Sequence, residues 1–191
     1  MQLPDSFLRL LLERCRRGSK IGVLIAKQLI GDLTCQQHTD ICLFVDGFAH
    51  QIHTHAGESR VQNWIARNME RYQTDGFGLW AVALKETGEM IGDCGITMQN
   101  IHGTMLPEIG YHIRKDKQRK GYASEAAAAC IRYAFEHYDF PAVYSYMKYT
   151  NIPSQRTAMK NGMTFAEEYE DPDNTYTRVY VIHREKWSKQ K

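Results

Sequence analysis

The residues best suited to chemistry lie in Gln118-Arg-Lys-Gly-Tyr-Ala123, a short basic turn with one glycine. The apolar stretch Glu108–Ile113 comes before it and is typical of a strand, whereas the residues after it repeat with a helical period. The first N–H groups of a helix lack intrahelical partners, and the helix dipole adds partial positive charge at that end. Arg119 and Lys120 add further positive charge, and Gly121 allows a ligand to approach the backbone closely. The segment therefore predicts a site that holds phosphate groups.

The helix predicted after this turn has one apolar face. Its apolar residues follow the i, i+3, i+4, i+7 spacing of a helix with one buried side. They are Ala123, Ala126, Ala127, Cys130, Ile131, Ala134, Phe135 and Tyr138. A Walker loop, which ends in Gly-Lys-Ser/Thr, and the Gly-x-Gly-x-x-Gly run of dinucleotide folds are both missing from the sequence. An ordinary basic turn between a strand and a helix remains an alternative.

The turn resembles the Gln/Arg-x-x-Gly-x-Gly/Ala signature of the GCN5-related N-acetyltransferases (GNAT), which bind the pyrophosphate of acetyl-CoA. Gln118, Gly121 and Ala123 fill the three defining positions. A predicted hairpin at 76–95, with its turn at 86–89, is similar to the central hairpin of the branch that acetylates the N-termini of ribosomal proteins. The order and spacing of these segments are more specific than the turn alone.

A further segment, 151–165, resembles the Asn-x-x-Ser and Gly-Phe pattern of the same branch. Asn151, Ser154 and Gly162 match the pattern, and Met163 stands where Phe is usual. The resemblance covers about residues 62–187 and leaves 1–60 atypical.

Composition and hydropathy restrict the possible classes of protein only weakly. The 191 residues, 43% apolar and 24% charged, fit one globular domain over 1–191, and a net charge of +2 does not favour a nucleic-acid partner. Five cysteines without paired spacing are expected to be reduced thiols of a cytoplasmic protein: Cys15, Cys35, Cys42, Cys94 and Cys130. We expect no membrane association, because 21–30 is too short to span a bilayer and 1–17 lacks the charge order of a signal peptide. The chain is expected to be a monomer or a homodimer.

The predicted elements alternate in the manner of an α/β protein. Helices are predicted at 5–16, 57–73, 121–137 and 153–161, and strands near 78–84, 89–98, 107–113, 142–149, 163–169 and 176–183, whereas 21–30 could be either. Hairpin-linked strands come before strand–helix–strand units, which indicates a mixed sheet. The resemblance implies the GNAT fold: a mostly antiparallel sheet, flanked by helices, with a splayed parallel strand pair that holds the cofactor.

The same resemblance implies where acetyl-CoA binds. The pantetheine arm would lie between the strands 108–113 and 144–150, with hydrogen bonds from the backbone of Ile113 and Arg114. The amides of 119–124 would receive the pyrophosphate. The residues expected to bind the cofactor in this turn are Gln118, Arg119, Lys120, Gly121, Tyr122, Ala123 and Ser124.

Two more polar residues are placed at the cofactor by the resemblance. Asn151 and Ser154 would contact the cofactor or its sulfur. Asn151 ahead of Pro153 is also suited to cap a helix, so a capping role remains an alternative.

The reaction implied by the family is direct attack of an amine on the thioester, which needs a proton acceptor. Glu108 is the candidate base, and it shares strand parity with Gly110 and His112. An exposed carboxylate at a strand end is the alternative for Glu108. His112 could titrate near neutral pH, although a packed or solvent-facing histidine is the alternative.

One position departs from the family pattern. Many acetyltransferases carry a Tyr that protonates the leaving thiolate, and Ala158 occupies that place. Ser154 or water would then protonate the thiolate, or it would leave unassisted. Ser154 is therefore the second catalytic candidate.

The acceptor would be a small-molecule amine or a protein N-terminus, selected by loops at 35–60 and 99–107 and by the C-terminal hairpin. An acidic group could attract a cationic amine or form a solvated turn: Glu167, Glu168, Glu170, Asp171 and Asp173. No Cys or carboxylate completes a familiar metal spacing with His50, His53 and His55, so no metal is expected. The sequence thus predicts an acetyl-CoA-dependent N-acetyltransferase, with a non-catalytic acyl-CoA-binding module as the alternative.

Overall fold

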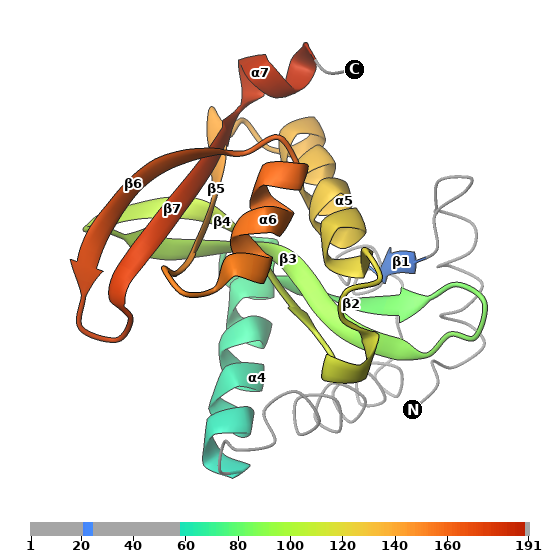
Figure 1. The fold of residues 1–191 in the computed structure, drawn as a ribbon. Helices are drawn as coiled ribbons and strands as arrows, with labels where there is room; N and C mark the ends of the chain where they lie inside the picture. The colour runs from blue at the N-terminus through green and yellow to red at the C-terminus, as the bar shows by residue number, and fades with distance from the viewer. Residues whose placement is uncertain (1–20, 25–57, 190–191) are drawn as a thin grey trace. The chain divides into compact units, whose positions relative to one another are not determined.

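The computed structural model describes residues 21–24 and 58–189 (Figure 1). The chain divides into two compact units, each made of two segments. The first consists of Met1–Gly95 and Tyr111–Ala126, and the second of Ile96–Gly110 and Ala127–Lys191.

The elements follow one another in the order that the sequence predicts. They are β1 (Ile21–Leu24), α4 (Glu58–Thr74), β2 (Leu79–Leu84), β3 (Met90–Ile101), β4 (Thr104–Ile113), η1 (Lys115–Lys117), α5 (Tyr122–His137), β5 (Ala142–Lys148), α6 (Ile152–Lys160), β6 (Thr164–Asp171), β7 (Thr175–His183) and α7 (Arg184–Ser188). β1 settles the ambiguous start of 21–30 as a strand, whereas the predicted helix at 5–16 lies outside the described residues. The short elements η1 and α7 were not predicted, because three and five residues are too few to show a period.

The first unit contains an antiparallel group of strands. β1 pairs with β2 and β2 with β3, and Trp80, Val82 and Ile91 are almost fully buried in this group. Tyr72 of α4 donates a hydrogen bond from its hydroxyl to the carbonyl of Leu79. A helix and the hairpin that follows it are therefore joined within this unit.

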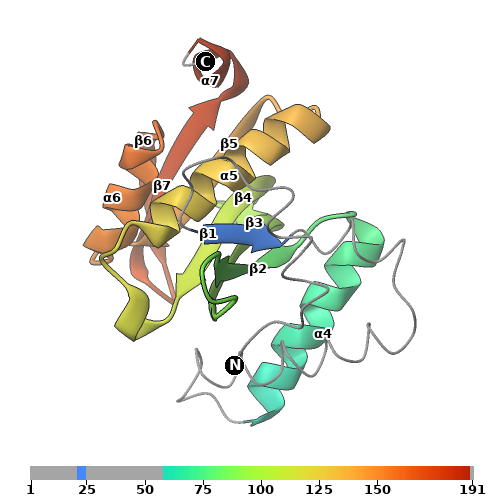
Figure 2. The same cartoon turned by 90° about the vertical axis from the view of Figure 1, so that its right-hand side faces the viewer.

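The second unit contains both strand orientations. β4 runs parallel to β5 with Glu108 opposite Tyr144, whereas β7 pairs antiparallel with both β5 and β6. α6 packs on β5 and β7, and α7 continues from the end of β7 (Figure 2). The mixed, mostly antiparallel sheet with one parallel pair confirms the predicted fold class.

The apolar stripe predicted for α5 is confirmed. Within the second unit it is formed by buried residues that recur at helical spacing. They are Ala127, Cys130, Ile131, Ala134 and Phe135. Val143 of β5 and Ile182 of β7, in the same unit, are also fully buried.

The connection between β3 and β4 differs from the prediction. We expected a loop over 99–107, but the strands continue to Ile101 and from Thr104, so only two residues turn the chain. His102 and Gly103 have φ angles of 49° and 84°. Positive φ at both central residues matches the tight hairpin turn that fits the twist of antiparallel strands. The other predicted acceptor loop, 35–60, lies largely outside the described residues.

Two cysteines occupy the positions predicted for them. Cys94 lies in β3 and Cys130 in α5, and both are buried free thiols. Cys15, Cys35 and Cys42 lie outside the described residues. In the part of the chain that the structure describes, no helix combines the length and the hydropathy needed to cross a bilayer.

Arg184 joins α7 to the end of α5. Its guanidinium donates to the carbonyls of Phe135 (2.6 Å) and Phe140 (3.0 Å), and also to that of Tyr138. The charge lies over the ring of Phe135, 5.2 Å from its centre. These carbonyls lie in the last turn of the helix and just after it, where intrahelical donors run out, so Arg184 supplies the missing partners.

Replacing this side chain should destabilise the protein. We expect Arg184→Ala to lower the free energy of unfolding by about 3 kcal/mol, because three carbonyls lose a charged donor. The free energy of unfolding of Arg184→Lys should lie between those of Arg184→Ala and the wild type, because lysine keeps the charge but not the planar guanidinium group. Urea denaturation measures both values. Lys186→Ala on the exposed side of α7 is the control, and an equal loss there would contradict a specific role for Arg184.

Candidate functional site

The predicted phosphate turn connects η1 to α5 in the first unit. Gln118 donates a hydrogen bond from Nε2 to the carbonyl of Ile113 (2.8 Å), which ties the turn to the end of β4. Gln118 therefore shapes the turn through its side chain. The Ile113 carbonyl keeps a second lone pair for another donor.

The backbone of the turn adopts two left-handed conformations. Arg119 has a φ of 61° and Gly121 a φ of 88°. A left-handed residue other than glycine costs about 1–2 kcal/mol, and such strain gathers at functional sites. A Cβ added to Gly121 would meet nothing within 4 Å, so the space beside this glycine is open. Glycine is needed here for its conformation, and the turn leaves room for a ligand.

The start of α5 has the arrangement of an anion site. The first intrahelical bond runs from the N–H of Glu125 to the carbonyl of Gly121 (3.0 Å). The amides of Tyr122, Ala123 and Ser124 come before that bond and have no intrahelical acceptor. They are the donors that an anion at a helix N-terminus uses.

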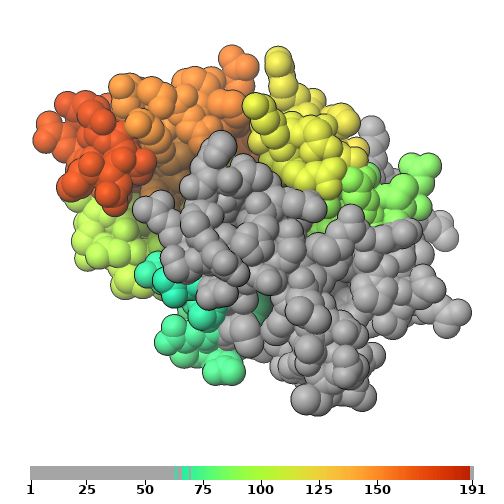
Figure 3. Space-filling view, turned by 90° about the horizontal axis from the view of Figure 1, so that it is seen from below, coloured from blue at the N-terminus to red at the C-terminus, as the bar shows by residue number. Residues whose placement is uncertain are grey.

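The positive charges of the turn fall into two groups. Arg119 and Lys120 are exposed and form no ion pair with any described residue. The yellow atoms of this region lie open to solvent in Figure 3. These two side chains are the ones available to a phosphate group.

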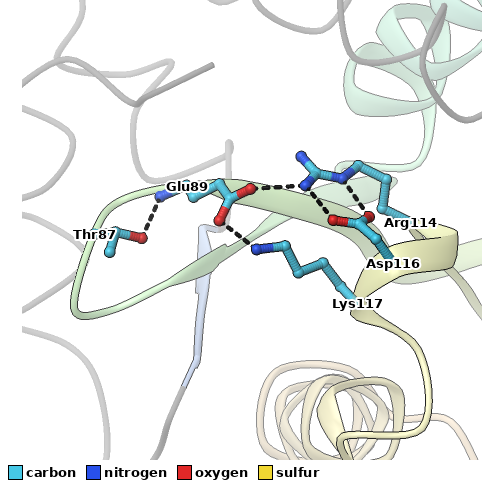
Figure 4. Close-up of polar contacts among 5 residues, drawn as sticks. All are labelled: Thr87, Glu89, Arg114, Asp116 and Lys117. Atoms are coloured by element: carbon cyan, nitrogen blue, oxygen red, sulfur yellow. Dashed lines mark hydrogen bonds and ion pairs between the residues drawn. The ribbon is translucent and has the colours of Figure 1, made fainter.

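The second group is held by carboxylates (Figure 4). Arg114 lies 2.8 Å from Glu89 and 2.7 Å from Asp116, and Lys117 lies 2.6 Å from the other oxygen of Glu89. The N–H of Arg114 donates to the carbonyl of Ile91 (2.9 Å). Arg114 has two backbone groups that were predicted to bind pantetheine, its N–H and its carbonyl. Because the N–H already donates to Ile91, only the carbonyl remains available for pantetheine.

These contacts shift the pKa values of the network that Figure 4 shows. Bonds from Arg114 hold the pKa of Asp116 at about 2. Lys117 and then Arg114 lower the pKa of Glu89, and Asp116 and then Glu89 raise the pKa of Arg114. The network fixes η1 to the start of β3 in its charged form.

The lowered carboxyl pKa values predict a loss of stability in acid. A group whose folded pKa lies below its unfolded value stabilises the protein above the unfolded pKa, and this contribution disappears as the pH falls through the folded pKa. For Asp116 that window runs from its ordinary value of 3.8 down to about 2. We expect Glu89→Gln to cost about 1 kcal/mol at pH 7 and the difference from the wild type to shrink as the pH falls below 4.5, the ordinary pKa of this carboxyl group. Urea denaturation across this pH range tests the prediction, with the exposed Glu86→Gln as control.

Asn151 forms the cap that was the alternative to cofactor binding. Its side-chain oxygen accepts a hydrogen bond from the N–H of Ser154 (3.3 Å), and Pro153 follows within the first turn of α6. The capping role is thus observed. A cofactor contact by Asn151 or by the half-buried Ser154 stays a prediction.

Gln155 is a residue that the sequence analysis missed. It is buried, donates to the carbonyl of Tyr149 (2.7 Å) and accepts from both Arg178 and Tyr180 at 3.2 Å. It joins α6 to β7 and to the end of β5. A glutamine inside a helix carries no motif, so only the tertiary structure could have identified it.

Ala158 lies one turn further along α6 and is 2% exposed. The position where many relatives carry a tyrosine is therefore filled by a buried methyl group. No proton for a leaving thiolate can come from this side chain.

Glu108 is held by a polar chain within the second unit. Gln99 donates to Thr97 Oγ1 (3.2 Å), and Thr97 donates to Glu108 Oε2 (3.0 Å). Thr97 is almost fully buried, whereas Glu108 is half-buried. The side chain of Glu108 is therefore oriented by a hydrogen-bond chain through Thr97 and Gln99, which periodicity alone did not reveal.

The acidic group lies on β6 and its turn, and most of its members have partners. His102 contacts Glu167 at 3.0 Å, and Arg178 contacts Glu168 at 2.5 Å. Asp171 accepts from the N–H of Asp173 (2.8 Å) and from the hydroxyl of Thr177 (2.9 Å). The group therefore orders the hairpin, as the alternative interpretation of a solvated turn suggests.

Among residues 21–24 and 58–189, no group of three or more His, Cys, Asp or Glu side chains could hold a metal ion. His50, His53 and His55 lie outside the described residues.

Known proteins resemble this chain in sequence. A family model described as an acetyltransferase (GNAT) domain matches residues 27–164. Protein YkkB of Bacillus subtilis (strain 168) is 38% identical over 105 residues, which make up 55% of this chain and 59% of that protein. The chain thus spans about three fifths of the length of this curated relative.

Solved structures resemble it in fold. RimL, a ribosomal L7/L12 α-N-protein acetyltransferase in complex with coenzyme A, aligns with a TM-score of 0.60 at 14% identity, covering 88% of this chain and 96% of its own. A spermidine N-acetyltransferase SpeG chimera from Vibrio cholerae and hSSAT aligns with a TM-score of 0.66 at 12% identity, covering 89% and 99%. At these identities the likeness concerns the fold. Because the family model matches well over half of the sequence, the chain belongs to the GNAT family of acetyltransferases.

Proposed function

We propose that this protein is an acetyl-CoA-dependent N-acetyltransferase that moves an acetyl group to a primary amine by direct attack on the thioester. The observation that carries the proposal is the turn before α5. It combines the left-handed Gly121, the amides that precede the first intrahelical bond, and the exposed charges of Arg119 and Lys120. This arrangement suits the pyrophosphate of a coenzyme A thioester.

Each candidate residue has a role in this proposal. The N–H groups of 119–124 bind the pyrophosphate, Gln118 holds the turn in shape, and Ile113 with the Arg114 carbonyl binds pantetheine. Glu108 accepts a proton from the amine. Asn151 and Ser154 contact the cofactor near its sulfur, and Ser154 or water protonates the thiolate.

The acceptor is proposed to be a small-molecule amine or a protein N-terminus. The names of the structural neighbours include both kinds of acceptor, a ribosomal protein and spermidine. Glu170 is exposed on β6 and has no ion pair among the described residues, so its carboxylate would favour a cationic substrate. The buried thiols of Cys94 and Cys130 suit a reducing compartment such as the cytoplasm.

Two measurements test this function. Isothermal titration should show heat with acetyl-CoA and with coenzyme A, because both carry the pyrophosphate. Thiol release should then show turnover with at least one member of a panel of polyamines, amino acids, aminoglycosides and peptides with a free N-terminus. Binding without turnover across the whole panel would favour a non-catalytic acyl-CoA-binding module, and no binding would overturn the proposal.

A further inference from the structure

The carboxylate of Glu89 spans η1, the short helical turn that leads into the proposed phosphate site, within the first unit (Figure 4). Its Oε1 lies 2.8 Å from a guanidinium nitrogen of Arg114, and its Oε2 lies 2.6 Å from Nζ of Lys117. Arg114 comes directly before η1 and Lys117 ends it, so both ends of this element are held. The three side chains are between 18% and 28% exposed. We call these three residues the Glu89 clamp.

The hairpin between β2 and β3 fixes the backbone of Glu89 itself. Its carbonyl accepts a hydrogen bond from the N–H of Leu84 (2.9 Å), and its N–H donates to Oγ1 of Thr87 (3.2 Å). A little further along, the carbonyl of Ile91 accepts from the N–H of Arg114 (2.9 Å). The side chain and the backbone of Arg114 are therefore both tied to an ordered hairpin.

The segment that the clamp holds needs support from outside. η1 has only three residues, none of them buried, and so short a 3-10 turn gains little from its own hydrogen bonds. Gln118 follows it at once, and Arg119 then adopts the left-handed φ of 61°. A residue other than glycine keeps such a conformation only where surrounding contacts determine it. The Glu89 clamp is a contact of this kind, because it fixes the residues just before the strained turn.

An ion pair in the second unit provides a contrast. Arg178 and Glu168 are 34% and 36% exposed, and they stand opposite each other in the ladder of β6 and β7. Backbone hydrogen bonds already join these two strands, so the pair adds no new connection. Glu89, in contrast, joins its hairpin to residues 25 and 28 positions later in the chain. An exposed ion pair usually contributes little to stability, so the value of the clamp lies in what it connects.

We propose that Glu89 is a positioning residue for cofactor binding; this inference rests on the function proposed above. The clamp holds η1 and thereby keeps the turn 118–121 in the shape that receives the pyrophosphate. The carboxylate itself would repel phosphate, so it helps binding only through the shape of the turn. Molecules in which the turn is not formed do not bind, and the apparent affinity falls with the fraction that is formed.

The charges of the segment make the opposite effect conceivable, which gives the test its two directions. If the carboxylate only masked Arg114 and Lys117, its removal would free these cations for the phosphates. Coenzyme A would then bind more tightly, and its affinity would depend more steeply on salt. The positioning role instead predicts weaker binding with an unchanged salt dependence, because Arg119, Lys120 and the first amides of α5 remain the partners of the phosphates.

Glu89→Gln tests the inference by isothermal titration with coenzyme A at several salt concentrations. We expect the Kd to rise about tenfold, as it would if the turn were formed in about one molecule in ten. With the best acceptor from the amine panel, the KM for acetyl-CoA should rise as well. The kcat at saturating acetyl-CoA should change by less than about twofold, because the loss concerns binding and not the chemical step. Glu86→Gln removes the same charge from an exposed position of the same hairpin, and it should bind no more weakly than the wild type.

Lys117→Met removes the other side of the clamp. It should also weaken binding, and it should add little in the Glu89→Gln background, because both changes break the same contact. A further loss in the double variant would mean that Lys117 contacts the phosphates directly, and this would contradict the inference. Far-UV circular dichroism at the titration temperature checks that each variant is folded.

The two proposals fail in different ways. A wild-type Kd or tighter binding in Glu89→Gln, in a protein whose wild type binds coenzyme A, would overturn the positioning role and leave the proposed function standing. Absence of binding by the wild type itself would refute the proposed function, and this inference with it.

Discussion

Gly121→Asp is expected to weaken acetyl-CoA binding by at least about 100-fold, which corresponds to about 2.7 kcal/mol. Two effects combine at this position. The φ of 88° is a left-handed conformation that a side chain resists, and the added carboxylate would stand beside the proposed pyrophosphate. Isothermal titration with acetyl-CoA measures the change.

Two controls separate charge from backbone strain. Gly121→Ala adds a Cβ into open space, so it should cost only the strain of the left-handed residue and less than about tenfold in affinity. Gly103→Asp places the same side chain at a φ of 84° in the β3–β4 turn, where it should lower stability but leave the cofactor Kd unchanged. An equal loss of affinity in all three variants would mean that Gly121 acts only through folding.

Glu108→Gln should lower kcat by about 100-fold or more, in the range of a lost general base. The Kd for acetyl-CoA should not change, since the amide has the same shape and the proposed pyrophosphate site is formed by other residues. Steady-state thiol release at saturating acetyl-CoA measures kcat, and titration measures the Kd.

Removing the hydrogen bond from Thr97 to Glu108 should have a smaller effect on kcat than replacing Glu108 itself. Thr97→Val removes the donor that orients Glu108 but keeps the carboxylate, so we expect a smaller loss of about tenfold, the equivalent of one ordinary hydrogen bond. A wild-type rate in Glu108→Gln would exclude Glu108 as the base.

The sequence predicted the parts of this protein that depend on local pattern. The stripe along α5, the strands from β2 to β7 and the cap at Asn151 all follow from spacing and from residue chemistry within a few positions. Residues 57–73 were likewise predicted as a helix, and α4 spans Glu58–Thr74. Such features can be predicted without knowing which residues are in tertiary contact.

The features that were not predicted depend on which strands and turns lie side by side. Glu89 and Lys117 are 28 positions apart, and Asp93 and His112 are 19 apart. These pairs form only once the chain has folded, and Gly92 permits the close approach of Asp93 to the strand that carries His112. Asp93 in particular is the single charged residue of β3, and its partner could not be identified from spacing alone.

The contact between Arg184 and the end of α5 has a consequence for biosynthesis. Its three acceptor carbonyls lie 44 to 49 positions earlier in the chain. During translation, the helix end therefore lacks this donor until residue 184 has been synthesised. β7, which pairs with both β5 and β6, is likewise synthesised after both of these strands. The second unit should thus acquire its protease resistance only after residue 184 has left the exit tunnel.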